Sequence, residues 1–371
     1  MKKKIRTRYG EIAVPNLPGD LIIRHLEKYG EWAYAETQFI SSLLRNDAKI
    51  LDVGAFLGTF SLGMAEGFPL RTLTLLEANP TTFEYLHENV DLHLSQTAVC
   101  LNQLLVPEGE QISKGWTGVN NLGATSFLKP NSVDEGFYEV EISSQSVSLR
   151  EIIDKHGPFD LIKLDIEGME ESIIGGLESP LDLRSSLLWL ECIESRSSLD
   201  LLEHLVTWGE PVHYCAFPVF NPKNYMGSEE PIFPFAYEAG LLVGEVDVSM
   251  TNPDACFGGI IQRVDSVDQL AEAMWYTPRW GLKNWENLPI KALIAQAAHD
   301  LIGEERRSYL WSTDKIERHI DNDGPSAKES TSLQRVGILE RELQRLKNII
   351  QDQEKVINDY HETISKQQSL D

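Results

Sequence analysis

Short apolar runs that end in acidic residues or glycine alternate with helix-like stretches from residue 50 onward. The runs are apolar on both faces, as strands are when helices cover both sides of a sheet. We expect strands at residues 49–53, 72–77, 161–166 and 187–192. We expect crossover helices at residues 58–66, 81–90 and 170–177. The alternation is typical of βαβ units and predicts an α/β domain with a doubly wound parallel sheet.

Three other segments of the body carry different patterns. We expect residues 1–48 to form a helical lead-in to the sheet. Glycine, asparagine, serine and proline interrupt the pattern between residues 106 and 138. This composition favours irregular or hairpin structure, which could cover the functional site. In residues 212–232 aromatic residues alternate with prolines and a glycine, so we expect a loop-rich cap near the functional face.

The last forty residues follow a heptad period. Apolar residues recur at every seventh position, and a second set is offset from the first. The two sets are Val336, Leu343, Ile350, Ile357 and Ile364, and Leu339, Leu346, Gln353 and Tyr360. The pattern predicts about four heptads of a parallel two-stranded coiled coil, and therefore a homodimer. A single amphipathic helix docked on the body is the alternative.

The net charge limits the classes of molecule that the protein is expected to bind. The chain has 57 acidic and 33 basic residues, a formal net charge of −24, so its average surface repels polyanions and disfavours nucleic acid. The four cysteines are scattered, which is typical of reduced thiols. We find no apolar run of about 18 residues for a membrane span, and no apolar stretch after the basic start for a secretory signal. We therefore expect a cytoplasmic protein.

The segment 52–58 reads DVGAFLG and stands where the first strand ends and a helix begins. Open α/β sheets bind ligands there, and glycines permit a close approach of the backbone. A dinucleotide is disfavoured, because Phe56 replaces the second glycine of a G-x-G-x-x-G turn and Asp52 would stand near the pyrophosphate. S-adenosylmethionine has an ammonium and a sulfonium instead of phosphates, so an acidic strand end favours it.

The end of the second strand adds a further carboxylate. Glu77 follows Asp52 by 25 residues, at a place where a carboxylate can accept both hydroxyls of a ribose. Asn79 and Pro80 then begin the next helix. Asp52 and Glu77 could instead be ordinary polar strand ends, stabilised by helix dipoles. Their order around the glycine turn favours an adenosyl cofactor.

Charged residues alternate at the end of the third predicted strand. Lys163, Asp165 and Glu167 should project toward one side of it, since side chains of a strand alternate between faces. Buried charges are costly unless they pair or perform chemistry. Asp165 is the first candidate for the base that deprotonates a hydroxyl acceptor. Alternatively, Asp165 and Glu167 could hold a divalent cation with Glu191, or Lys163 could only neutralise a carboxylate.

These segments together resemble the FkbM family of methyltransferases. Its members have a D-V-G-A-x-x-G-x-x-S loop, an acidic strand end followed by N-P, and a K-x-D-x-E-G strand. The matching segments here are residues 52–61, 77–80 and 163–168, with weaker matches at 30–32, 188–191 and 221–225. The resemblance covers residues 30–245. Phe56 stands where many relatives carry asparagine, so hydrogen bonds from that side chain are not expected.

The resemblance implies a Rossmann-like class I methyltransferase fold and O-methyl transfer from S-adenosylmethionine to a sugar hydroxyl of a glycan or a related metabolite. We expect a methyltransferase domain at 49–265, a helical extension at 266–320, a linker at 321–331 and a coiled-coil helix at 332–371. The cofactor would be held by Asp52, Gly54, Ala55, Gly58, Glu77 and Asn79. The catalytic residues would be Lys163, Asp165 and Glu167.

Two other functions stay open at this point. One is an NAD-dependent oxidoreductase or sugar-nucleotide enzyme that uses the same glycine turn. The other is a non-catalytic scaffold that acts through the coiled coil. A divalent cation has no support beyond the carboxylates themselves.

Overall fold

The computed structural model describes residues 2–277, apart from residues 68, 113, 119–120, 127–136, 142–143, 178–182, 184–185, 230–231, 233–236 and 247–258. All of these belong to the first of two compact units, residues 1–310. The second unit, residues 311–371, lies outside the described residues, as do the predicted linker and coiled coil. No helix in the described part of the chain is long and apolar enough to cross a membrane.

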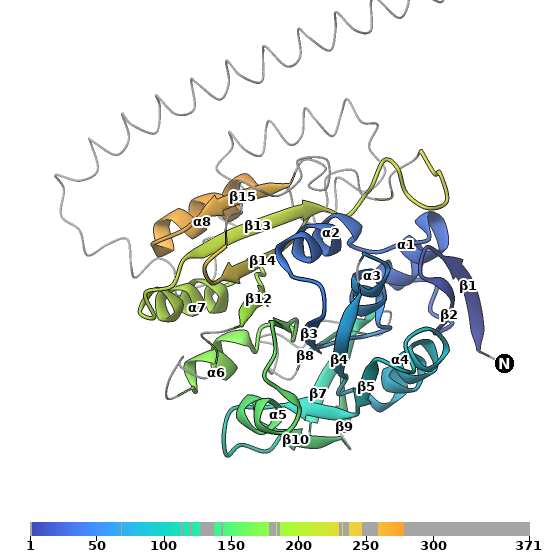
Figure 1. Ribbon diagram of the computed structural model, residues 1–371, viewed down its shortest axis with the longest axis horizontal. Coiled ribbons are helices and arrows are strands. Elements are labelled where there is room, and N and C mark those ends of the chain that lie inside the picture. Colours follow the sequence, from blue (N-terminus) through green and yellow to red (C-terminus); the bar gives the residue numbers. More distant parts are fainter. Residues whose placement is uncertain are drawn as a thin grey trace, which may run out of the picture. The chain divides into compact units, whose positions relative to one another are not determined.

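A mixed sheet, with eight strands among the described residues, forms the centre of the fold (Figure 1). In spatial order the strands are β15 (Ile260–Arg263), β13 (Val212–Pro218), β14 (Tyr237–Val243), β12 (Leu187–Glu191), β11 (Leu161–Leu164), β3 (Ala48–Val53), β4 (Leu70–Leu76) and β5 (Ala98–Leu101). The five strands from β12 to β5 pair in parallel, whereas β14 pairs antiparallel with both β12 and β13. The strand order reverses between β3 and β11, and such a switch point is where open α/β sheets bind ligands.

The predicted doubly wound sheet is therefore confirmed in its central part. The four predicted strands are β3, β4, β11 and β12, and the three predicted helices are α3 (Thr59–Gly67), α4 (Pro80–His93) and α6 (Glu170–Gly175). The remaining helices of the described residues are α1 (Leu21–Tyr29), α2 (Tyr34–Leu43), α5 (Leu149–His156), α7 (Arg196–Val206) and α8 (Val267–Tyr276). Helix α8 begins the predicted helical extension, and residues 278–320 lie outside the described residues.

The helical lead-in is wrong for its first part. A β-hairpin of β1 (Lys3–Thr7) and β2 (Gly10–Val14) precedes α1 and α2. The buried Asn89 of α4 ties the hairpin to the body, because its amide bonds both the N–H and the carbonyl of Ala13 and also the carbonyl of Leu57. Local apolar periodicity could not reveal this attachment, since Asn89 is far from β2 in the sequence.

Two loop predictions had different outcomes. The expected hairpin structure is present as a small antiparallel sheet of β7 (Lys114–Gly118), β8 (Asn121–Ser126) and β9 (Phe137–Glu141). A further pair, β6 (Gln103–Leu105) and β10 (Gln145–Val147), is parallel. Only part of the expected cap is loop, because its first seven residues form the buried strand β13, between β15 and β14.

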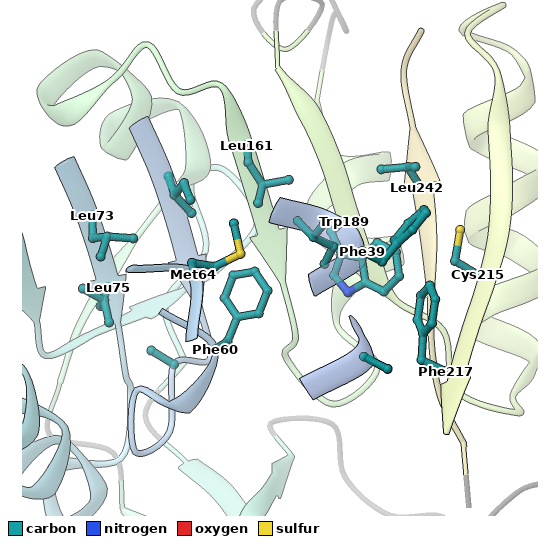
Figure 2. Packing of buried hydrophobic residues seen from close by; sticks show 14 of the residues in the cluster. Phe39, Phe60, Met64, Leu73, Leu75, Leu161, Trp189, Cys215, Phe217 and Leu242 are labelled. Carbon is teal, nitrogen blue, oxygen red and sulfur yellow. The ribbon is translucent and has the colours of Figure 1, made fainter. Parts of the chain in front are cut away.

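A hydrophobic core lies between the sheet and the helices α2 and α3. Phe39 of α2 packs against Trp189 and Phe217, with ring centroids 6.4 and 4.9 Å away. Figure 2 shows these rings beside Leu242 and, further along the sheet, Phe60 and Met64 of α3 near Leu161. This apolar layer fixes α2 over the middle of the sheet, next to the ligand-binding ends of the strands.

Candidate functional site

A cavity of about 440 Å³ opens at the carboxyl ends of β3, β4, β11 and β12. Its walls include the last residues of these four strands and those that directly follow them, together with residues of α1, α2, the start of α3, β6 and the start of β14. It therefore lies at the switch point of the sheet. Of the nine predicted site residues, the cavity brings together seven. They are Asp52, Gly54, Ala55, Glu77, Lys163, Asp165 and Glu167.

The glycine turn is pressed between the ends of two neighbouring strands. The backbone N–H groups of Gly54 and Ala55 both donate to the carbonyl of Leu76, each at 3.0 Å. On the other side, a Cβ on Gly54 would stand 1.8 Å from the carbonyl oxygen of Asp165, and Gly54 has φ +79°. The short distance and the positive φ each require glycine at position 54. A Cβ would collide with the backbone of Asp165, and L-residues avoid this backbone conformation.

Glu77 closes the turn from the β4 side. Its Oε2 accepts a hydrogen bond from the N–H of Phe56 at 3.0 Å, and its Oε1 accepts one from the N–H of Asn79 at 2.7 Å. Withdrawal from water raises the pKa of Glu77 to about 7, although the two backbone hydrogen bonds oppose the change. Each oxygen keeps a lone pair for a ligand, since a carboxylate can accept about four hydrogen bonds.

Two predicted cofactor residues do not line the cavity and instead support it. Gly58, with φ +84°, lets the turn approach α4, since a Cβ there would lie 3.0 Å from Leu86. Asn79 caps α4, and its side chain accepts hydrogen bonds from the N–H groups of Thr81 and Thr82. The motif therefore contains residues that shape the turn as well as residues that face the ligand space.

Lys163 joins the carboxylates of β3 and β11. It is 4% exposed, and its Nζ donates to Asp165 Oδ2 at 2.6 Å and lies 4.0 Å from Asp52 Oδ1. Burial alone would lower the pKa of Lys163, but Asp165, Asp52 and Glu36 outweigh it and raise the pKa. Lys163 is thus a permanent cation, which matches the alternative that it neutralises carboxylates.

Asp52 is completely buried and only partly satisfied. Ser61 Oγ donates to its Oδ2 at 2.7 Å, whereas its Oδ1 accepts no hydrogen bond in the described structure. A buried carboxylate oxygen without a donor is costly unless a ligand supplies one. Because Asp52 lines the cavity, that donor can come from a bound molecule.

Asp165 and Glu167 face the cavity from the turn after β11. The strand ends at Leu164, so the two carboxylates extend beyond the sheet, and Glu167 adopts a left-handed conformation with φ +53°. The side chain of Asp165 is 40% exposed. Burial first, and then repulsion by Asp165 and Glu170, raises the pKa of Glu167 to about 8. The expected clustering of these charges is present, although strand alternation is not its cause.

Three acidic residues that line the same cavity were not among the predicted site residues: Glu36 of α2, Glu194 after β12 and Glu238 of β14. Glu36 is 7% exposed, and burial raises its pKa to about 8. A signal for Glu36 was present, because it precedes the buried Phe39 and Ile40 by three and four positions on one helix face. No local pattern marks Glu238, since only the pairing of β14 with β12 brings it to the site.

The cavity lining is strongly acidic. Among the described residues that form it, eight carry carboxylates and one, Lys163, is basic. The acidic ones are Glu36, Asp52, Glu77, Asp165, Glu167, Glu191, Glu194 and Glu238. Within the described ranges no group of three or more Asp, Glu, His or Cys side chains is arranged to hold a metal ion.

A comparison with family models matches residues 52–208 to the methyltransferase FkbM domain. No curated protein sequence matches the chain significantly. Among solved structures, methyltransferase FkbM from Methylobacillus flagellatus KT has 16% identity and a TM-score of 0.35, with 57% of this chain and 48% of that chain covered. The chain thus spans about half the length of that protein.

Two O-methyltransferases are similar at a comparable level. A putative O-methyltransferase from Klebsiella pneumoniae has 16% identity and a TM-score of 0.35, covering 62% of this chain and 91% of that chain. The O-methyltransferase from Bacillus cereus, solved in complex with SAH, has 13% identity and a TM-score of 0.31, covering 57% and 84%. The sheet order and the cavity described above agree with the Rossmann-like class I methyltransferase fold. Residues 52–208, which include the glycine turn, Glu77 and the Lys163–Asp165 pair, are thus identified as a methyltransferase FkbM domain.

Proposed function

We propose that the cavity binds S-adenosylmethionine and that the protein transfers its methyl group to an oxygen of a small-molecule or glycan acceptor, such as a sugar hydroxyl. The observation that carries this proposal is the convergence of Asp52, Gly54 and Glu77 on one cavity at the switch point of the sheet.

The residues present fit this cofactor. The two oxygens of Glu77 each retain an acceptor site, which matches the two hydroxyls of a ribose. Gly54 leaves the turn without a side chain against the end of β11. Asp52 Oδ1 lacks a hydrogen-bond donor, and an ammonium group of the ligand can provide one.

The charge of the cavity separates this cofactor from a dinucleotide. A pyrophosphate carries two negative charges and needs cationic or N–H partners. Lys163 is the one basic residue among the described cavity residues, and Asp165 already binds it at 2.6 Å. S-adenosylmethionine has a net positive charge near its reacting centre, so the acidic lining of the cavity attracts it. The acidic lining of the cavity therefore disfavours the NAD-dependent alternative.

The chain's own residues would position the acceptor and take its proton. When bound, the cofactor supplies a methyl group on a positively charged sulfur. Asp165 is the first candidate for the base, because it faces the cavity and Lys163 holds its carboxylate in place. It would accept the hydroxyl proton as the methyl carbon leaves sulfur and bonds to oxygen. Glu167, with a pKa raised to about 8, is the second candidate.

Calorimetry on the full chain tests the proposal. We expect S-adenosylhomocysteine to bind in the micromolar range, about −8 kcal/mol, and NAD not to bind. Glu77→Ala should weaken binding by about 1–3 kcal/mol, since it removes charge-assisted hydrogen bonds. The control is Glu84→Ala, whose side chain is 73% exposed on α4 and should leave the affinity unchanged. Tight binding of NAD, or unchanged affinity in Glu77→Ala, would contradict the proposal.

We propose further, from the heptad pattern alone, that residues 332–371 dimerise the protein. Deleting them should halve the mass of the particle, apart from the deleted residues, while the body stays folded. Light scattering measures this mass, and an unchanged assembly would contradict dimerisation through the tail.

A further inference from the structure

We infer that the acceptor carries a protonated amine, which Glu36, Glu191 and Glu238 hold on the β12–β14 side of the cavity. This inference rests on the proposed function and adds to it the chemical class of the acceptor, a compound of the amino-sugar type. Three features of the described residues carry it. Among these residues, Glu36 of α2 is buried and makes no hydrogen bond or ion pair, the buried Oε2 of Glu191 in β12 accepts no hydrogen bond, and the lining of the cavity is acidic with Lys163 as its one basic residue.

Glu36 is the first feature. It lines the cavity at 7% exposure, and it makes no hydrogen bond or ion pair within the described part of the chain. Such a carboxylate is costly unless a cation or a proton neutralises it. Among the described residues, the cation that stabilises the ionised form of Glu36 is Lys163, whose ammonium already bonds to Asp165 at 2.6 Å. The dipole of α2 also stabilises a negative charge in the first turn of the helix, where Glu36 lies, but this effect is small compared with the cost of burying the carboxylate.

Glu191 and Glu238 lie across one antiparallel pair of strands. Glu191 pairs in register with Gly240, two residues beyond Glu238, so both carboxylates stand at the same end of the sheet. Glu191 Oε2 is buried and accepts no hydrogen bond from the described residues. Burial and the neighbouring carboxylates, including Glu238, raise the pKa of Glu191 well above its usual range.

The position of this group separates it from the proposed cofactor residues. Glu77 follows β4, while Glu191 and Glu238 belong to β12 and β14, with β3 and β11 between them. Glu36 interacts electrostatically with Lys163, Asp165, Glu238 and Asp52, so it lies within reach of β3 and β11 as well as β14. The acceptor can therefore reach these carboxylates while its hydroxyl stays near Asp165.

The charge balance selects the class of ligand. Lys163, the one basic residue among the described cavity residues, already bonds to Asp165. Without a ligand, Glu36 and Glu191 keep their protons more readily than exposed carboxyl groups do, because burial raises the pKa of both. A phosphorylated or carboxylated acceptor would meet further repulsion. A neutral sugar would donate hydrogen bonds but would not stabilise the ionised form of these two carboxyl groups. An ammonium group supplies three N–H donors and a positive charge, so it can donate hydrogen bonds to Glu36 and Glu191 and also stabilise their ionised form.

Three probes that share one pyranose ring test the inference: glucosamine, glucose and glucose 6-phosphate. Binding to the full chain is measured by calorimetry at pH 7 in the presence of S-adenosylhomocysteine. We expect glucosamine to bind at least about ten-fold more tightly than glucose, a difference of about 1.4 kcal/mol, and glucose 6-phosphate not to bind. The preference should weaken as salt is added, because it is electrostatic.

Variants assign the effect to the cluster. Glu36→Gln should abolish the preference for glucosamine and leave the affinity for S-adenosylhomocysteine unchanged. Glu238→Gln serves the same purpose if Glu36→Gln does not fold. The control is Glu84→Gln on the exposed face of α4, which should change neither affinity.

Several results would overturn the inference. Equal binding of glucosamine and glucose, binding of glucose 6-phosphate, or no binding of glucosamine at millimolar concentration would each do so. A loss of S-adenosylhomocysteine affinity in Glu36→Gln would assign Glu36 to the cofactor instead. Saturable binding of magnesium chloride that Glu36→Gln abolishes, without glucosamine binding, would assign the cluster to a metal. Failure of S-adenosylhomocysteine to bind would refute the proposed function alone, since the three sugars can still be compared on the free protein.

Discussion

The contact between the glycine turn and the end of β11 can be tested with Gly54→Ala. A Cβ at this position would lie 1.8 Å from the carbonyl oxygen of Asp165, and the residue has φ +79°. The substitution must therefore strain the backbone and also push apart the ends of β3 and β11. Since the contacted atom belongs to Asp165, the displacement reaches the carboxylate that we propose as the base.

The expected magnitude has two parts. A left-handed conformation costs a residue with a Cβ about 1–2 kcal/mol, and forcing extra volume into a packed site costs about 1–3 kcal/mol more. Gly209 provides a matched control, because it has φ +76° and nothing within 4 Å of its added Cβ. Gly209→Ala should therefore show only the first cost. Any loss of unfolded-state entropy is the same for both variants and cancels in the comparison.

Urea denaturation of the full chain, followed by circular dichroism, measures both free energies of unfolding. Gly54→Ala should lose about 1–3 kcal/mol more than Gly209→Ala. Calorimetry with S-adenosylhomocysteine should show weaker binding for Gly54→Ala only. If the two variants lose the same stability and bind alike, the close contact with Asp165 does not shape the cavity, and the reasoning is refuted.

Three further predictions concern the surroundings of the cavity. Asn89→Ala removes three buried hydrogen bonds to the N-terminal hairpin and the glycine turn, so urea denaturation should show a loss of about 2–4 kcal/mol; a loss near zero would contradict it. Glu31→Ala deprives Arg8 of its buried partner at 2.8 Å and should lower the free energy of unfolding by about 3 kcal/mol. An unchanged midpoint of urea denaturation would show that the pair is dispensable. The raised pKa values of Glu36, about 8, and Glu77, about 7, mean that the folded protein retains protons which the unfolded chain releases near 4.5. Stability of the ligand-free protein should therefore fall as the pH rises from about 5 to about 8, and Glu36→Gln should flatten this slope in denaturation curves recorded across that range.

The central strands of the sheet and the cavity residues at the ends of these strands were predictable, because short segments of the sequence mark them. Apolar runs mark β3, β4, β11 and β12, and the residue that ends a buried strand necessarily lies at the edge of the sheet. Asp52 and Glu77 were found in this way. The motif could not separate Gly54, which faces the cavity, from Gly58 and Asn79, which shape the turn behind it, because both roles require the same residue types.

The sequence by itself therefore determined the parallel strands, the glycine turn and the family to which they point. Only the tertiary structure decided that β14 enters the sheet between β12 and β13, that a hairpin precedes α1, and that Glu36 and Glu238 reach the cavity. The reason is physical: a backbone turn and a run of apolar side chains depend on neighbours in the chain, whereas strand order and burial depend on contacts between remote segments. The acidic pocket is such a product, since carboxylates from α2, β12 and β14 gather around one space only after the sheet has formed.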